Sequence, residues 1–177
     1  YTADPGTEQG RRVHELALIA GAEVLWESPG PAGTLAGDSL ARGVRTVIVE
    51  VGGGTSFDTP LMDRGLRGVT NLLKHVGMLE GEPNVDPARV VVRDGMSLRP
   101  RHGGLFLPEV GLAHLGKRVP GGTLLGRVVS PQSFAEIDRL EAPYEKTEIM
   151  MVRDRVSKVH PGDYAYILGD GGSGYDL

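Results

Sequence analysis

The stretch RTVIVEVGGG, residues 45–54, decides the fold prediction for this chain. Its apolar residues, Val47 to Val49 and Val51, are all β-branched, which is typical of a strand buried on both faces of a sheet. One carboxylate, Glu50, interrupts them directly before three glycines, where the chain is expected to turn. An ionisable group at the end of a buried strand requires an explanation.

Helices and strands are expected to alternate around this strand. The predicted order is a helix from Thr7 to Gly21, a strand over 23–28, a short helix over 34–43, the strand over 44–51 and a helix over 58–77. Thr7 and Asp58 are the expected N-caps of the two longer helices. Met62, Leu66, Val69, Leu73 and Val76 recur at the spacing of one apolar helix face. This order predicts an α/β layer.

The chain changes character near residues 80–89, which are rich in proline and charge. The expected domains are 1–86, an α/β domain, and 87–177, a small all-β domain. Two segments of the second part are alike: Val119 to Gly122 and Val159 to Gly162 each read Val-x-x-Gly and precede a short apolar strand. Such a duplication predicts a quasi-symmetric β structure similar to the biotinyl/lipoyl barrel-sandwich.

Composition excludes several classes of protein. The 177 residues contain no cysteine, so disulfides and thiolate metal sites are excluded, and a cytoplasmic location is expected. No apolar run is long enough to span a membrane. The net charge of −4 carries no basic patch, so no nucleic-acid partner is expected. The 27 glycines and 12 prolines favour short strands and tight turns.

Glu50 has two interpretations from its position alone. It can cap the following turn or pair with an arginine such as Arg45 or Arg64. Alternatively, it faces the ligand crevice at the carboxyl edge of the sheet and acts as a general base. A general base of this kind usually works beside a metal ion. The five histidines, at 14, 75, 102, 114 and 160, show no zinc-ligand spacing, so no metal site is expected within this chain.

Several segments together resemble the succinylglutamate desuccinylase/aspartoacylase family of zinc-dependent deacylases. They include HELALIAGAEVLWES at 14–28, VIVEVGGG at 47–54, GLRGVTNLLKHVGML at 65–79 and the run from Gly103 to Pro131. The resemblance covers nearly the whole chain and matches the C-terminal half of the family. It implies that residues 1–86 are the C-terminal part of a catalytic α/β domain with a zinc-carboxypeptidase-like mixed sheet, and that the β domain, 87–177, follows it. The glycine-rich stretch is most similar to the bacterial branch with N-acetyl-diaminobutyrate deacetylases.

The resemblance also implies roles for individual residues. Glu50 would be the general base, Gly52, Gly53 and Gly54 would line the turn beside the substrate, and Tyr144 would reach the substrate from the β domain. The family's zinc ligands, a His-x-x-Glu pair and a later histidine, match no position here. The chain is therefore expected to begin after them and to be inactive alone. The implied substrate is an N-acyl amino acid or a related small amide.

Two other functions stay open at this point. The β domain could be a binding or regulatory module, in which case Glu50 is structural. It could also be a biotinyl/lipoyl-like carrier, in which case Lys146 is the modified lysine, although its surroundings lack the Met-Lys motif of such carriers. Assembly into homo-oligomers is left open as well.

Overall fold

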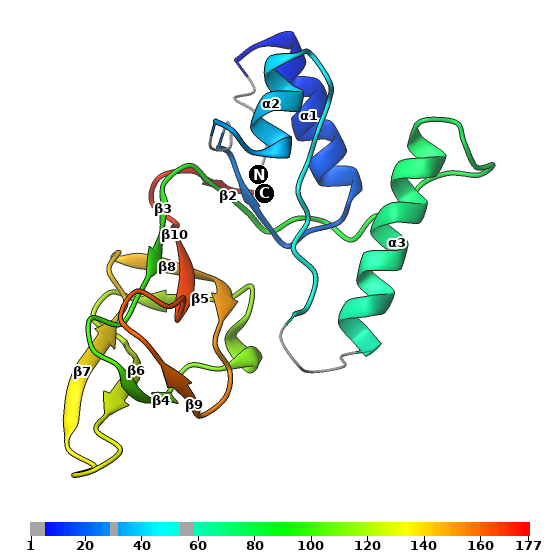
Figure 1. Cartoon of the computed structure of the whole chain (residues 1–177). Helices are drawn as coiled ribbons and strands as arrows, with labels where there is room; N and C mark the ends of the chain where they lie inside the picture. The colour runs from blue at the N-terminus through cyan, green and yellow to red at the C-terminus, as the bar shows by residue number, and fades with distance from the viewer. Residues whose placement is uncertain (1–5, 29–31, 54–58) are drawn as a thin grey trace. The chain divides into compact units, whose positions relative to one another are not determined.

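The computed structural model describes residues 6–28, 32–53 and 59–177, and the chain divides into two compact units (Figure 1). The first, the N-terminal unit, comprises Tyr1–Val91 with Asp176–Leu177, and the second, the β unit, comprises Val92–Tyr175. Compactness does not show which part folds by itself, so the expected domain boundary between residues 86 and 87 stays a prediction.

Three helices and one small sheet make up the described part of the N-terminal unit. The helices are α1 (Glu8–Ile19), α2 (Leu35–Ala41) and α3 (Thr59–His75). The sheet has the order β1-β2-β11, and its strands are β1 (Val24–Trp26), β2 (Val90–Val92) and β11 (Tyr175–Asp176). Its core joins α1 to the sheet through Ala17, Leu25, Ala88 and Val91.

Local sequence signals set the helix ends as predicted. The Thr7 hydroxyl accepts a hydrogen bond from the Gly10 amide at 2.9 Å and caps α1. Gly21, Gly43 and Gly77 follow the three helices with positive φ angles of 74°, 81° and 76°, a backbone conformation that favours glycine. The expected cap Asp58 lies outside the described residues.

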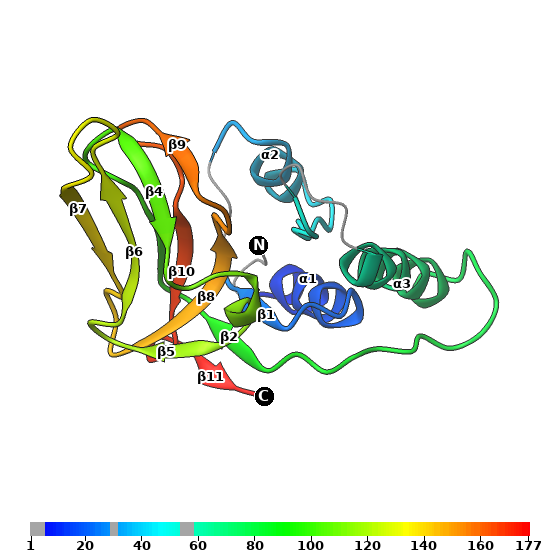
Figure 2. The same ribbon diagram turned by 90° about the horizontal axis from the view of Figure 1, so that it is seen from below.

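Helix α3 packs on α1 through its polar face. Its buried residues are Gly68 and Asn71, and a Cβ at Gly68 would lie 2.6 Å from the Ala20 carbonyl oxygen. Figure 2 shows α1 running beside α3. The apolar face of α3, which the spacing of its residues predicts to be buried, is largely exposed: Met62 is 51% exposed, Leu66 67%, Val69 56% and Val76 51%.

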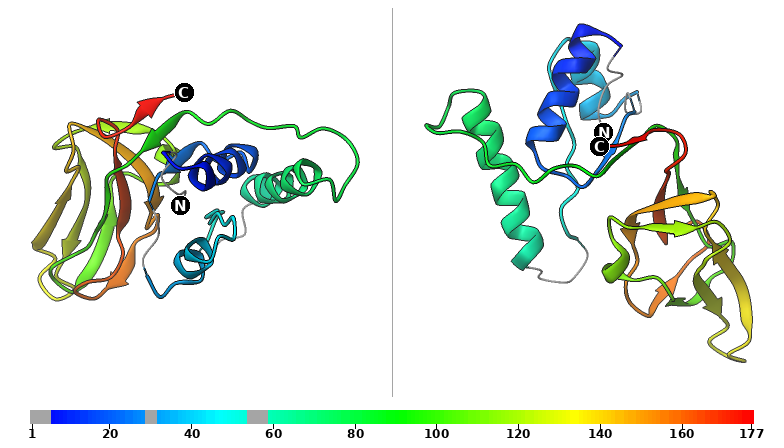
Figure 3. Two further views of the ribbon diagram at one scale, coloured as in Figure 1. Left: turned by 90° about the horizontal axis from the view of Figure 1, so that it is seen from above. Right: turned by 180° about the vertical axis from the view of Figure 1, so that it is seen from behind.

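The predicted strand over 44–51 is wrong for this structure. Residues 44–53 form neither helix nor strand and run as the coil between α2 and α3 (Figure 3). Ile48, Val49 and Val51 are 38%, 41% and 37% exposed. A strand needs a neighbouring backbone for its N–H and C=O groups, and among the described residues no strand pairs with this segment. Apolar composition alone cannot supply that neighbour.

The β unit consists of two four-stranded antiparallel sheets, visible as two layers in Figure 2. One has the order β3-β10-β8-β5, with strands β3 (Gly95–Leu98), β10 (Tyr166–Asp170), β8 (Lys146–Val152) and β5 (Arg118–Pro120). The other has the order β7-β6-β4-β9, with strands β7 (Glu136–Glu141), β6 (Leu124–Val129), β4 (Gly104–Pro108) and β9 (Ser157–Val159). A single 3₁₀ turn, Leu112–His114, follows β4.

The duplication seen in the sequence is built into this topology. Exchanging β5 for β9, β6 for β10, β8 for β4 and β3 for β7 converts the order of one sheet into that of the other. Val119 and Val159 are both buried, and Gly122 and Gly162 both have positive φ, 76° and 86°. The quasi-symmetric β structure is therefore confirmed. The finer assignment to the barrel-sandwich class stays a prediction.

Both sheets contribute to one core in the β unit. Its buried members include Phe106, Leu125, Val128, Leu140, Ile149, Val159, Tyr166 and Leu168. The rings of Phe106 and Tyr166 meet edge to face with 6.0 Å between centroids. This core packs the two sheets together and so positions the turns that connect their strands.

Candidate functional site

Glu50 is an exposed residue near the end of the coil 44–53. The two residues that follow Val51 have backbone angles suited to glycine, since φ is +63° at Gly52 and +144° at Gly53. Gly54 lies outside the described residues. A side chain at either glycine would strain the turn, so the sequence Glu-Val-Gly-Gly fixes how the chain leaves Glu50.

The end of this coil lies against the first half of α3. A Cβ on Gly52 would lie 3.8 Å from the Leu61 side chain, and one on Gly65 would lie 3.1 Å from Val51 Cγ1. Arg64, considered above as a structural partner of Glu50, instead donates to Glu23 at 2.6 Å. The coil is therefore positioned by apolar contacts with the helix and by the two glycines.

Tyr144, the second predicted site residue, lies in the turn between β7 and β8 of the β unit. Thr147 holds this turn, because its hydroxyl donates to the Tyr144 carbonyl at 2.8 Å and accepts from the Tyr144 amide at 3.1 Å. Burial raises the pKa of Tyr144, and the negative charges of Asp170 and Asp94 raise it further. The phenol therefore stays neutral and able to donate a hydrogen bond.

A recess of about 480 Å³ opens beside Tyr144. Its lining residues are Pro143, Tyr144, Glu145, Lys146, Asp170 and Gly172. This volume falls within the range of small-molecule sites, roughly 300–1,000 Å³. Asp170 had no signal in the sequence, since it reaches the recess only because β10 pairs with β8 and sets Asp170 opposite Thr147. Lys146, two residues from Tyr144, could have been expected from the sequence.

The predicted site residues belong to two different units. Glu50, Gly52 and Gly53 belong to the N-terminal unit, and Tyr144 belongs to the β unit.

The described residues do not assemble a metal site. Within 6–28, 32–53 and 59–177, no three His, Asp or Glu side chains come together as ligands. His14 pairs with the buried Glu27, with 3.3 Å between Nδ1 and Oε1. The His160 amide donates a hydrogen bond to the Asp163 carboxylate at 3.0 Å, so Asp163 stabilises a turn. A zinc ion therefore does not fit the donor groups that this part of the chain offers.

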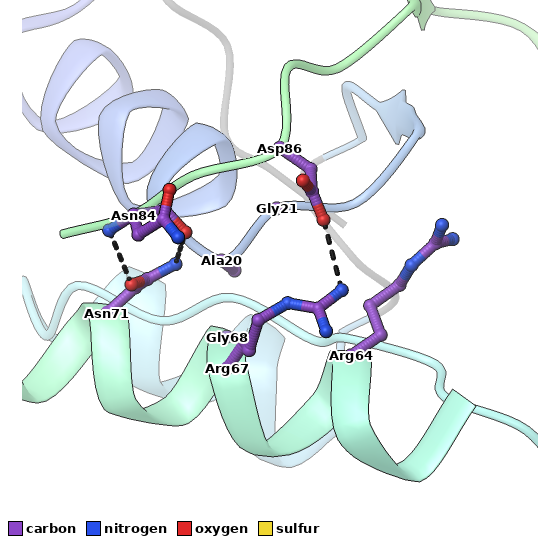
Figure 4. Close-up of a pocket in the computed structure, with 8 residues that line it drawn as sticks. All are labelled: Ala20, Gly21, Arg64, Arg67, Gly68, Asn71, Asn84 and Asp86. Atoms are coloured by element: carbon purple, nitrogen blue, oxygen red, sulfur yellow. Dashed lines mark hydrogen bonds and ion pairs between the residues drawn. The ribbon is translucent and has the colours of Figure 1, made fainter. Parts of the chain in front are cut away.

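A second pocket, drawn in Figure 4, lies between α3, the end of α1 and residues 84–86. Asn71 binds the backbone of Asn84 through both ends of its amide, at 2.9 Å each, and Arg67 pairs with Asp86 at 3.1 Å. The cavity holds about 10 Å³, room for about one water molecule. This cavity lies where α3 packs on residues 84–86, and it is too small for a substrate.

The comparisons with known proteins rest on structure. No protein-family model and no curated protein matches the chain. The apo structure of the ectoine utilization protein EutE (DoeB) from Ruegeria pomeroyi superposes with a TM-score of 0.80 at 21% identity, over 96% of this chain and 53% of that one. A succinylglutamate desuccinylase/aspartoacylase from Rhodobacter sphaeroides gives 0.75 at 23%, over 96% and 52%. A succinylglutamate desuccinylase from a Silicibacter species gives 0.78 at 23%, over 96% and 52%.

The chain has the succinylglutamate desuccinylase/aspartoacylase fold. The resemblance seen in the sequence is confirmed at the level of the fold. The chain spans about half the length of the solved structures that it matches. This fold is a sheet-rich α/β arrangement with few helices, as predicted in its coarse form. No helix in the described part of the chain is long and apolar enough to cross a membrane.

Proposed function

We propose that this chain is part of a deacylase that hydrolyses the amide bond of an N-acyl amino acid or a related small amide. The observation that carries the proposal is Glu50: in a chain with the deacylase fold, it is an exposed carboxylate followed by a turn that two glycines shape. The structures that share this fold bear deacylase names or a role in ectoine utilization. An N-acetyl-diaminobutyrate-type substrate is the specific form of the proposal.

Glu50 would act as the general base of this reaction. Its carboxylate takes a proton from the attacking water and delivers that proton to the leaving amine nitrogen as the C–N bond breaks. Proton transfer by a positioned carboxylate typically contributes about 10²- to 10⁴-fold to the rate. The absence of side chains at Gly52 and Gly53 lets a substrate approach the backbone beside this carboxylate.

Tyr144 would contact the substrate from the β unit. Its neutral hydroxyl is a hydrogen-bond donor suited to an acyl or carboxylate oxygen, and the recess beside it also carries the cationic Lys146. Thr147 would position the turn.

Zinc remains part of the proposal, although no ligand set for it comes together among the described residues. The ligands would lie in the part of the fold that this chain does not span. We further propose a cytoplasmic location and no nucleic-acid or membrane partner, since the chain carries no basic patch and no apolar run of membrane-spanning length.

The test is an activity comparison in the longest chain that the gene encodes. Release of free amine is measured with an N-acetyl-diaminobutyrate, an N-succinylglutamate and an N-acylaspartate substrate. Glu50→Gln is expected to retain the fold and to lower kcat by about 10²- to 10⁴-fold. Glu80→Gln, which alters another exposed carboxylate of the same unit, is the matched control and should keep normal turnover. Near-normal turnover of Glu50→Gln would leave Glu50 as a turn residue and refute the catalytic role.

The binding-module and carrier alternatives make different predictions. A carrier requires a covalent group on Lys146, which is exposed at the start of β8. The intact mass of the protein purified from its source would then exceed the sequence mass, and Lys146→Arg would remove the difference. A binding module would leave all three substrates intact in every variant.

A further inference from the structure

The recess beside Tyr144 carries two opposite charges that do not pair with each other. Lys146 and Asp170 both line it, and within the described chain no side chain forms an ion pair with the Lys146 ammonium. Asp170 uses one carboxylate oxygen, Oδ1, to accept a hydrogen bond from the Gly172 amide at 2.8 Å. A cation and a carboxylate oxygen are therefore both available to a ligand in the same recess.

The turn that carries Asp170, residues 170–173, is held firmly in place. The Gly171 amide donates to the Lys146 carbonyl oxygen at 2.7 Å, which ties this turn to the start of β8. A Cβ on Gly171 would lie 2.8 Å from Oε1 of Glu148, a fully buried carboxylate of β8. The turn thus packs directly on the strand, and the Asp170 carboxylate is oriented before any ligand binds. Such preorganisation lowers the entropic cost of binding.

The charges of the recess favour one class of ligand. Its charged lining residues are Glu145, Lys146 and Asp170, two acidic and one basic, so the net charge is −1. Burial is the main reason that the pKa of Tyr144 is raised, and the negative charge of Asp170 raises it further. The Asp170 carboxylate therefore acts on the same space as the phenol. A recess of this charge repels a ligand that carries only carboxylates.

We propose that this recess binds a small zwitterion, with the ligand's ammonium at Asp170 and its carboxylate at Lys146. The ammonium donates to Oδ2 of Asp170, the oxygen that the Gly172 amide leaves available. Charge-assisted hydrogen bonds of this kind are stronger than neutral ones. The volume of about 480 Å³ accommodates a ligand of amino-acid size.

The same arrangement assigns a substrate class, and this step rests on the proposed deacylase function. An N-acetyl-diaminobutyrate carries a free ammonium and a carboxylate, whereas N-succinylglutamate and N-acylaspartate carry carboxylates and no ammonium. Asp170 would then determine specificity by favouring the first substrate and repelling the other two. The binding step itself concerns the β unit alone and does not require that the protein be a deacylase.

Binding of N-acetyl-diaminobutyrate to the 177-residue chain, followed by amide NMR, tests the proposal. The shifts should saturate and should concentrate at residues 143–147 and 170–173. Asp170→Asn keeps an oxygen that can accept the Gly172 amide hydrogen bond but removes the charge, and Lys146→Met removes the cation. Each should weaken binding by about 10-fold, as for the loss of a hydrogen bond to a charged group. N-acetylaspartate should bind at least about 10-fold more weakly to the parent chain.

The matched controls are Glu136→Gln and Lys158→Met, which remove exposed charges from the other sheet of the β unit and should leave binding unchanged. Equal binding of the two ligands would overturn the proposal. So would equal binding by the parent and Asp170→Asn, or an absence of shifts at the two turns.

Turnover in the longest chain that the gene encodes separates this proposal from the deacylase function. If that chain hydrolyses any of the three substrates and Asp170→Asn leaves its preference among them unchanged, the zwitterion recess is wrong and the deacylase function stands. If it hydrolyses none of them while binding to the 177-residue chain depends on Asp170, the deacylase function is wrong and the zwitterion recess stands.

Discussion

Asp138 shows how one carboxylate is stabilised inside the β unit. Its side chain is 2% exposed and accepts hydrogen bonds from the Arg101 guanidinium at 2.8 Å, the Arg101 amide at 2.6 Å and the Arg139 amide at 3.0 Å. Burial acts to raise the pKa of Asp138, but these hydrogen bonds and the Arg101 charge outweigh it and leave the pKa below its usual value. The charged form is therefore the one that folding favours.

This lowered pKa predicts an acid-dependent loss of stability. An aspartate with a depressed folded-state pKa stabilises the fold above its unfolded pKa, about 3.9, and the stabilisation is lost as the pH falls below that value. Asp138→Asn should lower the free energy of unfolding by about 1.5–3 kcal/mol at pH 7, the range for hydrogen bonds to charged groups. Its difference from the parent chain should shrink toward pH 3 in urea titrations.

The control for this prediction is Glu145→Gln, which removes an exposed carboxylate from the same unit. It should change stability by less than about 0.5 kcal/mol at either pH. A difference between Asp138→Asn and the parent that stayed constant from pH 7 to pH 3 would show that the carboxylate charge is not the source of the effect.

The packing of α3 depends on two glycines, Gly65 and Gly68, whose roles the sequence pattern did not predict. Gly68 lets α3 approach the end of α1, whereas Gly65, one turn earlier, faces only the Val51 side chain on the coil. The two glycines look alike in the sequence. Only the neighbour that each one meets, a carbonyl oxygen or a movable side chain, distinguishes them.

Alanine substitutions at these glycines should have opposite effects. Alanine is preferred to glycine within a helix by about 1 kcal/mol, and Gly65→Ala should realise part of this gain because the coil can shift. Gly68→Ala places a Cβ 2.6 Å from the Ala20 carbonyl oxygen, so the free energy of unfolding should fall by about 1–3 kcal/mol. Unfolding followed by Trp26 emission measures both variants. Equal stabilisation by both would contradict the α1–α3 packing.

The two sheets of the β unit are linked by Tyr166. Its ring is buried, and its hydroxyl lies 2.6 Å from the Leu125 carbonyl oxygen on β6 and 2.9 Å from the Val110 carbonyl oxygen. Burial is also the main reason that the pKa of Tyr166 is raised. The hydroxyl thus ties β10 of one sheet to β6 of the other.

Removing this hydroxyl should weaken the β unit without changing its fold. Tyr166→Phe is expected to lower the free energy of unfolding by about 0.5–1.5 kcal/mol, the usual net contribution of a hydrogen bond. Tyr164→Phe is the matched control, because Tyr164 is 47% exposed, and it should change stability by less than about 0.5 kcal/mol. Equal effects of the two substitutions would show that the link between the sheets adds nothing to stability.

At the scale of the whole molecule, the two units carry separate spectroscopic reporters. The only tryptophan, Trp26, belongs to the N-terminal unit, and the β unit holds Tyr144, Tyr164, Tyr166 and Tyr175. The β unit also has its own hydrophobic core. Each strand of its two sheets pairs only with strands of the same unit. The N-terminal unit leaves its most apolar helix face uncovered.

We expect the β unit to fold alone and to be the more stable of the two. Residues 92–175 expressed by themselves should unfold cooperatively, as followed by tyrosine emission in the absence of tryptophan. In the 177-residue chain, Trp26 emission should change at a lower denaturant concentration than tyrosine-weighted ellipticity does. Coincident transitions, together with an unfolded 92–175 fragment, would show one cooperative molecule instead.

Features that depend on near neighbours in the chain could be predicted from the amino-acid sequence. Helix ends follow from Thr7 and the glycines at 21, 43 and 77, because caps and left-handed residues act within a few positions. The Val-x-x-Gly duplication predicted the two-sheet symmetry, because the same local pattern forms the same strand and turn. The resemblance of several segments to the family predicted the fold in its coarse form, although the strand over 44–51 was wrong.

The neighbours of each apolar surface depend on the tertiary fold. The most apolar stretch, 45–51, is not a strand here, because sheet formation depends on partners that a segment cannot provide for itself. The best apolar helix face is likewise exposed, while Gly68 and Asn71 are buried. The recess at Tyr144 includes Asp170 only because β10 pairs with β8. These outcomes depend on contacts between residues far apart in the chain, which local sequence patterns do not predict.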